Sequence, residues 1–101
     1  MIVEQIRYYL AEENLEDFLA ARRELSSLRA RLDLPEGRSL IADPVPDEGP
    51  AVVWQCGYDD EGQMGLAEAR LMGSEEYASA RERINALVER VVLELYSADG
   101  D

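Results

Sequence analysis

The order of strand-like and helix-like segments constrains this chain more than any other feature of its sequence. Residues 2–10, 51–58 and 90–96 are rich in β-branched and aromatic side chains, which are typical of strands, and residues 38–43 form a shorter strand candidate. Helical periodicity separates the first strand from the second and the third from the last. The order β-α-β-β-α-β predicts an α+β, ferredoxin-like fold: a four-stranded antiparallel sheet with helices on one face.

The first helical segment has well-marked ends. Apolar residues recur at helical spacing from Leu15 onward, and Asn14 and Asp17 stand in the capping-box arrangement around its start. Pro35 and Gly37 end the segment, because neither residue type continues a helix well. We therefore expect one capped helix between the first two strands.

The second helical segment is expected in two pieces. An acidic start at residues 59–61 favours a helix from about Glu61 to Met72, and Gly73 ends it. Ser74 then caps a second piece, whose first turn is acidic. Residues 43–50 contain three prolines and predict a stiff loop.

The length of 101 residues suits one small domain. We predict a single domain over residues 1–97 and a frayed tail over 98–101. No apolar run approaches the roughly 20 residues that span a bilayer. The single cysteine cannot form an internal disulfide, so the predicted location is the cytoplasm.

The charge of the chain excludes several classes of partner. There are 22 acidic residues against 10 basic ones, for a net charge of −12. Phosphate backbones and anionic lipid surfaces repel such a protein, so we predict no nucleic-acid binding and no membrane binding.

Two missing residue types exclude much of catalysis. All ten basic residues are arginines, so no lysine can form a Schiff base. The chain also has no histidine, which removes imidazole bases, Ser-His and Cys-His pairs, and histidine ligands for zinc or haem. We predict no metal site and no cofactor, and no residue can be assigned as catalytic from the sequence.

Three of the expected strands carry apolar side chains on both sides, although helices cover only one face of the sheet. The opposed sets are Ile2, Ile6, Tyr8 and Leu10 against Val3 and Tyr9; Val52, Trp54, Cys56 and Tyr58 against Ala51 and Val53; and Val91, Leu93 and Leu95 against Val92 and Tyr96. A soluble monomer rarely exposes an apolar face of this size. We therefore predict a homodimer that packs sheet against sheet.

The chain resembles the NIPSNAP-like proteins of the dimeric α/β-barrel superfamily. Their opening pattern of an apolar pair, Glu, Tyr, Leu and a Leu-x-x-Phe helix is matched here by Met1, Ile2, Glu4, Tyr8, Leu10, Leu15 and Phe18. An apolar strand that ends in Tyr58-Asp59-Asp60, and a helix restart at Glu75-Glu76-Tyr77, are similar too. The likeness covers nearly the whole chain in layout.

The resemblance implies a barrel-like dimer with a cleft between sheet and helices in each subunit. Relatives include cofactor-independent monooxygenases, haem-degrading enzymes, cyclases, isomerases and proteins with no known activity, and fold alone does not choose among them. Two positions depart from the family pattern: Ile6 stands where an Arg is usual, and Trp54-x-Cys56 replaces His-x-Trp. A role that rests on that histidine is therefore not inherited, and haem chemistry is disfavoured.

The residues Tyr8, Trp54, Cys56 and Tyr58 are candidates for lining that cleft. One interpretation places the row from Trp54 to Tyr58 in the core or dimer interface, and Tyr8 in packing. The other makes it the wall of a cleft for a small apolar or aromatic molecule, with the tyrosine hydroxyls as hydrogen-bond donors. The function is then ligand binding, or cofactor-independent oxygenation or isomerisation; an interaction module without a ligand is the alternative.

Glu4 is the fifth cleft candidate. In a cleft, burial would raise its pKa and suit a general base. The alternative is an ion pair with an arginine such as Arg7, Arg38 or Arg90, and Glu94 carries the same ambiguity.

The helical arginines have a plainer interpretation. Arg22 and Arg23 lie among acidic residues on a helix, which predicts solvated pairings along its surface.

Overall fold

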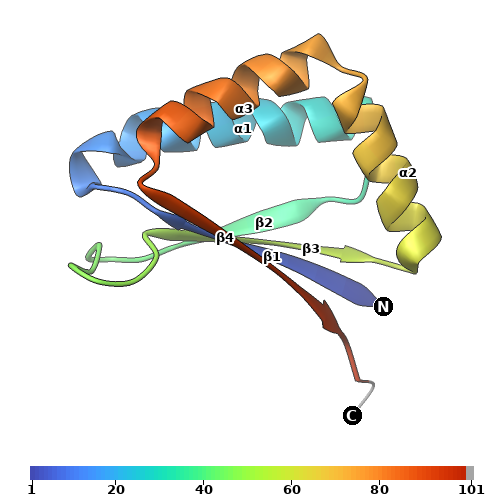
Figure 1. Ribbon diagram of the computed structural model, residues 1–101, viewed down its shortest axis with the longest axis horizontal. Helices are drawn as coiled ribbons and strands as arrows, with labels where there is room; N and C mark the ends of the chain where they lie inside the picture. Colours follow the sequence, from blue (N-terminus) through green and yellow to red (C-terminus); the bar gives the residue numbers. More distant parts are fainter. Residues whose placement is uncertain (100–101) are drawn as a thin grey trace.

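The computed structural model describes residues 1–99, so the last two residues of the predicted tail 98–101 lie outside it. Figure 1 shows one sheet with the helices gathered on one side. The elements in chain order are β1 (Ile2–Tyr9), a 3-10 turn (Glu12–Asn14), α1 (Leu15–Arg31), β2 (Gly37–Ile41), β3 (Val52–Tyr58), α2 (Glu61–Met72), α3 (Glu75–Leu87) and β4 (Arg90–Ser97).

The four strands form an antiparallel sheet in the order β2-β3-β1-β4. In this register Ile6 lies between Trp54 of β3 and Leu93 of β4. Because side chains alternate along a strand, the even-numbered residues of β1 and β3 face the helices and the odd-numbered residues face away. The predicted ferredoxin-like α+β fold is confirmed, with the second helical segment divided as expected.

Of the two expected helix caps the one at Ser74 is confirmed, and the acidic start of α2 supplies a further cap at Asp60. The Asp60 carboxylate accepts a hydrogen bond from the Gln63 amide at 2.8 Å, and the Ser74 hydroxyl accepts one from the Tyr77 amide at 3.3 Å. The cap predicted at Asn14 is wrong: a 3-10 turn leads directly into α1, so Asn14 has a near-helical backbone. An N-cap needs an extended backbone, and the Asn14 amide instead donates to the Leu87 carbonyl at 3.5 Å.

Gly37 begins β2 rather than merely ending the helix. A Cβ atom at this position would lie 2.3 Å from the indole Cζ2 of Trp54. The missing side chain therefore lets the Trp54 ring lie against the β2 backbone, on the face of the sheet that carries the helices.

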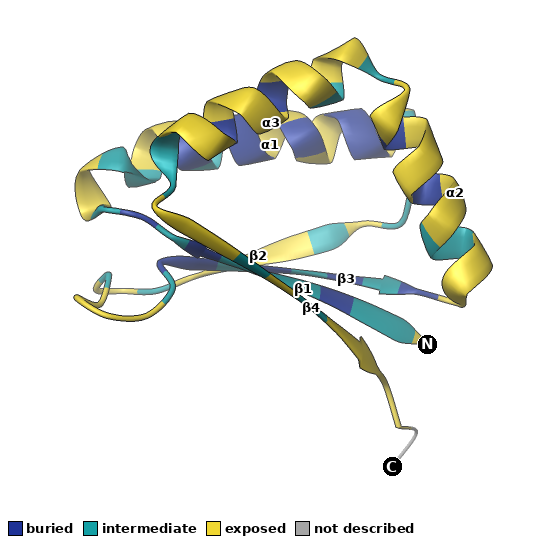
Figure 2. Cartoon of the chain, in the orientation of Figure 1, coloured by how far each residue is buried: buried dark blue, intermediate teal, exposed yellow. Residues whose placement is uncertain are grey.

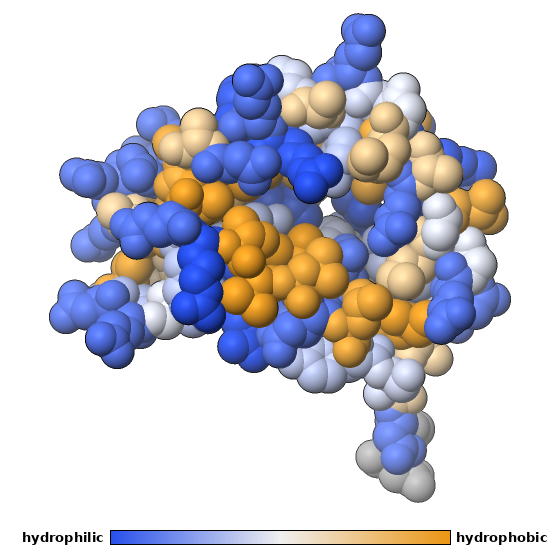
Figure 3. All heavy atoms as spheres, in the orientation of Figure 1, coloured by the Kyte–Doolittle hydropathy of each residue, from blue (hydrophilic) through white to orange (hydrophobic). Residues whose placement is uncertain are grey.

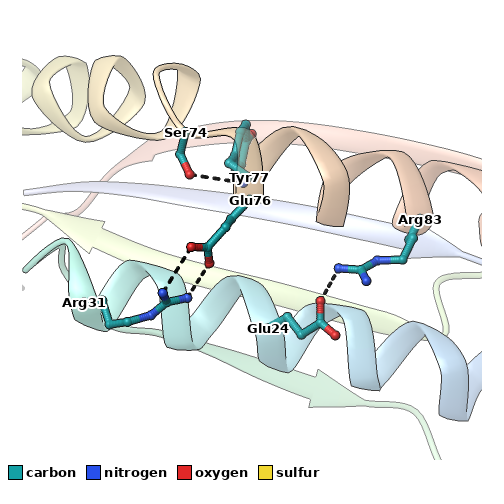
Figure 4. A network of polar contacts seen from close by, with 6 residues as sticks. All are labelled: Glu24, Arg31, Ser74, Glu76, Tyr77 and Arg83. Carbon is teal, nitrogen blue, oxygen red and sulfur yellow. Dashed lines mark hydrogen bonds and ion pairs between the residues drawn. The ribbon is translucent and has the colours of Figure 1, made fainter.

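The core lies between the sheet and the helices, as the dark blue segments in Figure 2 show. Phe18 and Val52 are fully buried there, and the Tyr8 and Phe18 rings pack with centroids 4.7 Å apart. On the outer side of the layer, Arg31 of α1 pairs with Glu76 of α3 at 2.6 Å, and Arg83 of α3 pairs with Glu24 of α1 (Figure 4). None of the helices within residues 1–99 is both long and apolar enough to cross a bilayer.

The helix-free face of the sheet carries a polar network at its centre. The Gln55 amide donates to Gln5 at 2.8 Å, the Arg7 guanidinium pairs with Glu94 at 2.9 Å, and the Tyr96 hydroxyl donates to Glu94 at 2.8 Å. Apolar and aromatic side chains surround this network, in the register positions of Val3, Tyr9, Leu40, Val53 and Val92.

Candidate functional site

A cavity of about 500 Å³ lies between the sheet and the helices. Side chains from β1, β3, β4 and all three helices line it, among them Ile6, Leu25 and Leu71. Figure 3 shows a hollow beneath the helical layer, with apolar surface gathered below it over β4. Val91 and Leu93 of β4 belong to the lining and are 43% and 56% exposed, so the cavity reaches the surface beside this edge strand.

Four of the five cleft candidates line this cavity. Glu4, Tyr8, Trp54 and Tyr58 all have even numbers in β1 or β3 and thus face the helices. Cys56 faces the same way but does not belong to the lining. Its sulfur is buried behind the cavity wall, 3.3 Å from Arg29 Nη2 and 3.6 Å from the Pro35 carbonyl oxygen.

Arg29 of α1 ties the helix to the strand beneath it. Its Nη2 donates to the Pro35 carbonyl at 2.9 Å and to the Tyr58 hydroxyl at 3.1 Å, and its Nε donates to Pro35 at 3.3 Å. The guanidinium carbon lies 5.0 Å from the centroid of the Trp54 ring. These contacts give a buried charge the partners it requires.

Arg22 is buried without comparable partners. Only 4% of the residue is exposed, and its guanidinium carbon stacks 4.2 Å from the centroid of the Trp54 ring. Within residues 1–99 its side chain makes no hydrogen bond or ion pair, and its Nε is sealed from solvent. Burial lowers the pKa of Arg22, against the opposing effect of Tyr8. The expectation of a solvated Arg22 is wrong.

A signal for the two buried arginines was present in the sequence. Residues Phe18, Arg22, Leu25 and Arg29 are spaced by four, three and four, which places them on one face of α1. The acidic residues near Arg22 in the sequence suggested surface pairing, but they lie on other faces of the helix. Spacing relative to the apolar stripe, rather than neighbouring charge, is the relevant signal.

Tyr8 and Tyr58 remain neutral donors at physiological pH. Burial raises the pKa of Tyr58 to about 12, although the Arg29 hydrogen bond opposes the shift. Burial likewise raises the pKa of Tyr8, which Arg22 opposes. Because the Tyr58 oxygen accepts a hydrogen bond from Arg29, its own proton is available to another acceptor.

Glu4 is a buried carboxyl without an ion pair among the described residues. Burial raises its pKa; Arg29 and Arg22 oppose this shift, and Glu68 adds to it. The interpretation that Glu4 pairs with Arg7, Arg38 or Arg90 is wrong, because the register places all three arginines on the helix-free face. Arg7 pairs there with Glu94 instead, and Arg90 stacks on Tyr9.

The polar groups of the cavity are mainly hydrogen-bond donors. Arg22, Tyr8 and Tyr58 can donate, and Glu4 offers a carboxyl group. Over the described part of the chain, no three Cys, Asp or Glu side chains come together as a metal site would require. The chemistry available is therefore orientation of an apolar molecule and stabilisation of a negatively charged oxygen.

Comparison with known proteins places this geometry among solved structures. No protein-family model matches the chain. No curated protein matches it at a significant level either. An uncharacterised NIPSNAP domain protein from Burkholderia xenovorans is 19% identical with a TM-score of 0.76, covering 99% of this chain and 96% of that one. A NIPSNAP-like domain protein from the same organism is 22% identical with a TM-score of 0.75, covering 98% and 85%.

This chain has the NIPSNAP fold. The resemblance seen in the sequence is thereby confirmed at the level of fold. The same fold extends to enzymes: a mutant of SnoaB, a cofactor-independent oxygenase from Streptomyces nogalater, is 14% identical with a TM-score of 0.73, covering 99% of this chain and 94% of that one. At such identities, the similarity concerns the NIPSNAP fold and not the chemistry of the cavity.

Proposed function

We propose that each subunit binds one small, mainly apolar molecule in the cavity between sheet and helices. The cavity carries this proposal, because its volume of about 500 Å³ lies in the range of small-molecule sites. An interaction module without a ligand would pack this space shut, so the open cavity speaks against that alternative.

The lining supports a flat or aromatic ligand. Trp54 offers a ring face, and Ile6 and then Leu93 extend the apolar wall from it toward β4. The Tyr8 and Tyr58 hydroxyls supply two donors that would orient the molecule. Entry is expected beside β4, where Leu93 is exposed.

Calorimetric titration with 2-naphthamide, a neutral bicyclic probe, tests this function. We expect saturable binding, and a few-fold loss of affinity in Tyr58→Phe because one hydrogen bond is removed. Tyr9→Phe is the matched control, since Tyr9 lies on the helix-free face and should leave affinity unchanged. Failure of the wild type to bind this or any related bicyclic compound, neutral or anionic, would contradict the proposal.

A second candidate function is cofactor-independent proton transfer, with or without oxygenation. Glu4 favours it, because a buried carboxylate with a raised pKa, free of ion pairs, suits a general base. Glu4 would take a proton from a carbon beside a substrate carbonyl, and the Tyr58 hydroxyl would donate to the resulting enolate oxygen. Return of the proton to another carbon gives isomerisation, whereas reaction of the enolate with molecular oxygen gives oxygenation.

Hydrogen–deuterium exchange into 2-tetralone, a bicyclic carbon acid, tests the base. We expect wild-type protein to accelerate exchange beside the carbonyl, and Glu4→Gln to lose at least about 100-fold of that acceleration. Gln5→Glu on the opposite face controls for added or removed charge in β1. Equal exchange rates in wild type and Glu4→Gln would exclude Glu4 as the base.

We also infer a homodimer through the helix-free face. Leu40 of β2 is 44% exposed there, and Tyr96, the member of the polar network on β4, is 46% exposed. Sedimentation velocity at micromolar concentration should give a dimer, and Leu40→Glu should shift it toward monomer. Leu66→Glu is the matched control, because this leucine is 65% exposed on α2 in the helical layer; a monomeric wild type would refute the dimer.

A cytoplasmic location is part of the same proposal. The single thiol, Cys56, is free and buried, which suits a reducing compartment. Cell fractionation with a tagged chain tests it, and recovery from a membrane or secreted fraction would contradict it.

A further inference from the structure

The unpartnered guanidinium of Arg22 points to the kind of ligand that the cavity holds. A buried arginine normally satisfies its five N–H groups with acceptors, because desolvating the charge is costly. Arg22 has only the face of Trp54 against it, and its Nε has no acceptor at all. Its two Nη atoms also lack hydrogen bonds within residues 1–99, and the residue lines the cavity. The described part of the protein therefore offers this guanidinium no hydrogen-bond acceptor.

Arg29 shows that the fold can give a buried arginine beside Trp54 its hydrogen-bond acceptors. It lies two helical turns further along α1, contacts the same Trp54 ring, and donates to Pro35, Tyr58 and Cys56. The difference is that Arg29 reaches a loop carbonyl and a strand hydroxyl, whereas Arg22 reaches the open cavity. Hydrogen bonds within the protein account for Arg29, whereas Arg22 stacks on Trp54 without a hydrogen bond.

The surroundings of Arg22 favour an anion. Its electrostatic neighbours are Tyr8, Arg29, Glu4 and Tyr77: Arg29 is a second cation, the tyrosines can donate, and Glu4 is the one acid among them. Three arginines and two glutamates line the cavity, in a chain whose net charge is −12. The lining of this cavity thus carries one more arginine than acidic residues, in contrast to the strongly acidic chain as a whole.

Building on the binding function above, we propose that the ligand is an aromatic or alicyclic oxyanion whose negative oxygen pairs with the Nη atoms of Arg22. The ring of the ligand lies along Trp54, Ile6 and Leu93, and its charged oxygen group points toward α1. A carboxylate and an enolate share this chemistry, since both present delocalised negative oxygen to a planar fork of donors.

Two pairs of probes test whether the ligand is negatively charged and whether that charge belongs to a carboxylate or an enolate. The first pair is 2-naphthoate and the neutral 2-naphthamide; the second is 2-hydroxy-1,4-naphthoquinone, an enolate at neutral pH, and its neutral 2-methoxy ether. Isothermal titration of the wild type should show at least about a tenfold preference for the anion of one pair. The pair that shows it identifies the ligand as a carboxylate or an enolate.

The variant Arg22→Met tests the residue. It should lose far more affinity for the anion than for 2-naphthamide, and with it the preference for the anion. Its thermal midpoint should equal or exceed that of the wild type, because an apolar side chain of similar length replaces an unpaired buried charge. Arg23→Met is the matched control, since Arg23 is the exposed neighbour on α1 and should keep the preference.

The outcomes separate this inference from the binding function. Equal binding of anion and neutral probe by the wild type overturns the oxyanion ligand and leaves the binding function standing. Binding of no probe overturns both. An Arg22→Met protein that keeps the preference overturns the role of Arg22. If this variant does not fold, the wild-type preference alone still decides whether the ligand is an anion.

Discussion

The two faces of the sheet treat the same kind of residue in opposite ways. Glu4 and Glu94 lie one residue out of register on the paired strands β1 and β4, so they point to opposite faces. Glu94, on the helix-free face, pairs with Arg7 and accepts a hydrogen bond from Tyr96. Glu4, on the helix side, is buried and has no such partner among the described residues.

This contrast between the two faces favours the helix side as the site of the proposed function. Polar groups on the helix-free face satisfy one another, as expected of a structural surface that can pack against a second copy. On the helix side, Arg22 and Glu4 are buried, and their side chains make no hydrogen bond or ion pair among the described residues. The hydrogen bonds that these groups lack add nothing to the stability of the fold, whereas a ligand can supply them.

Truncation of neighbouring residues in β3 should give the largest difference between the faces. Trp54→Ala should lower the free energy of unfolding by about 4 kcal/mol, because it removes a large buried side chain and leaves a cavity in the core. Gln55→Ala, on the other face, should cost about 1 kcal/mol through its hydrogen bond with Gln5. Urea unfolding followed by circular dichroism measures both; similar losses would remove the distinction.

A methyl group added at Gly37 tests how tightly the wall of the cavity is fitted. Gly37→Ala should cost about 2 kcal/mol and shift the fluorescence of Trp54, since its Cβ would overlap the indole ring. Gly65→Ala is the control: a Cβ there meets nothing within 4 Å, and in the middle of α2 it should add about 0.5–1 kcal/mol of stability. A fluorescence spectrum unchanged by Gly37→Ala would show that the ring moves freely.

Neutralisation of the two glutamates should change stability with opposite signs. Burial raises the pKa of Glu4 above its ordinary 4.5, so above that pH the unfolded chain loses a proton that the native state retains. The free energy of unfolding therefore falls as the pH rises from 4.5 through the native pKa. Glu4→Gln should be more stable than wild type at pH 7, with the difference vanishing below about pH 4.

Glu94→Gln is the counterpart on the helix-free face. It should lower the thermal midpoint modestly at pH 7, because it removes the partner of Arg7. Thermal melts of both variants between pH 4 and pH 8 measure the contrast. A destabilised Glu4→Gln at pH 7 would mean that Glu4 is well paired in the native state.

The ion pairs between α1 and α3 should have the smallest effect. Arg31 and Glu76 are 59% and 62% exposed, so solvent screens their attraction although Arg31 lowers the pKa of Glu76 (Figure 4). Glu76→Gln should leave the thermal midpoint unchanged within error, at low and at high salt. A clear loss of stability would show that these pairs fasten the helical layer over the cavity.

Local patterns in the sequence determined the fold. The alternation of side chains in residues 51–58 placed Trp54 and Tyr58 on one side of a strand, and the break at Gly73 and Ser74 divided the second helical segment. Both patterns were readable because strand alternation and helix capping act within a few residues. The same reasoning misjudged Asn14, whose backbone is set by the turn before it. Sequence reasoning also placed Glu4 correctly on the first strand, but it could not identify the charged residues that lie near the carboxyl group.

The chemistry of the cavity was decided only by tertiary structure. Arg22 and Arg29 are alike in the sequence, and each lies on the inward stripe of α1. Arg29 donates to the Pro35 carbonyl and the Tyr58 hydroxyl, because the loop before β2 returns beneath the end of the helix. Arg22 lies too far from that loop and borders the cavity instead. Whether a buried charge has a partner depends on contacts between distant segments, which no local pattern contains.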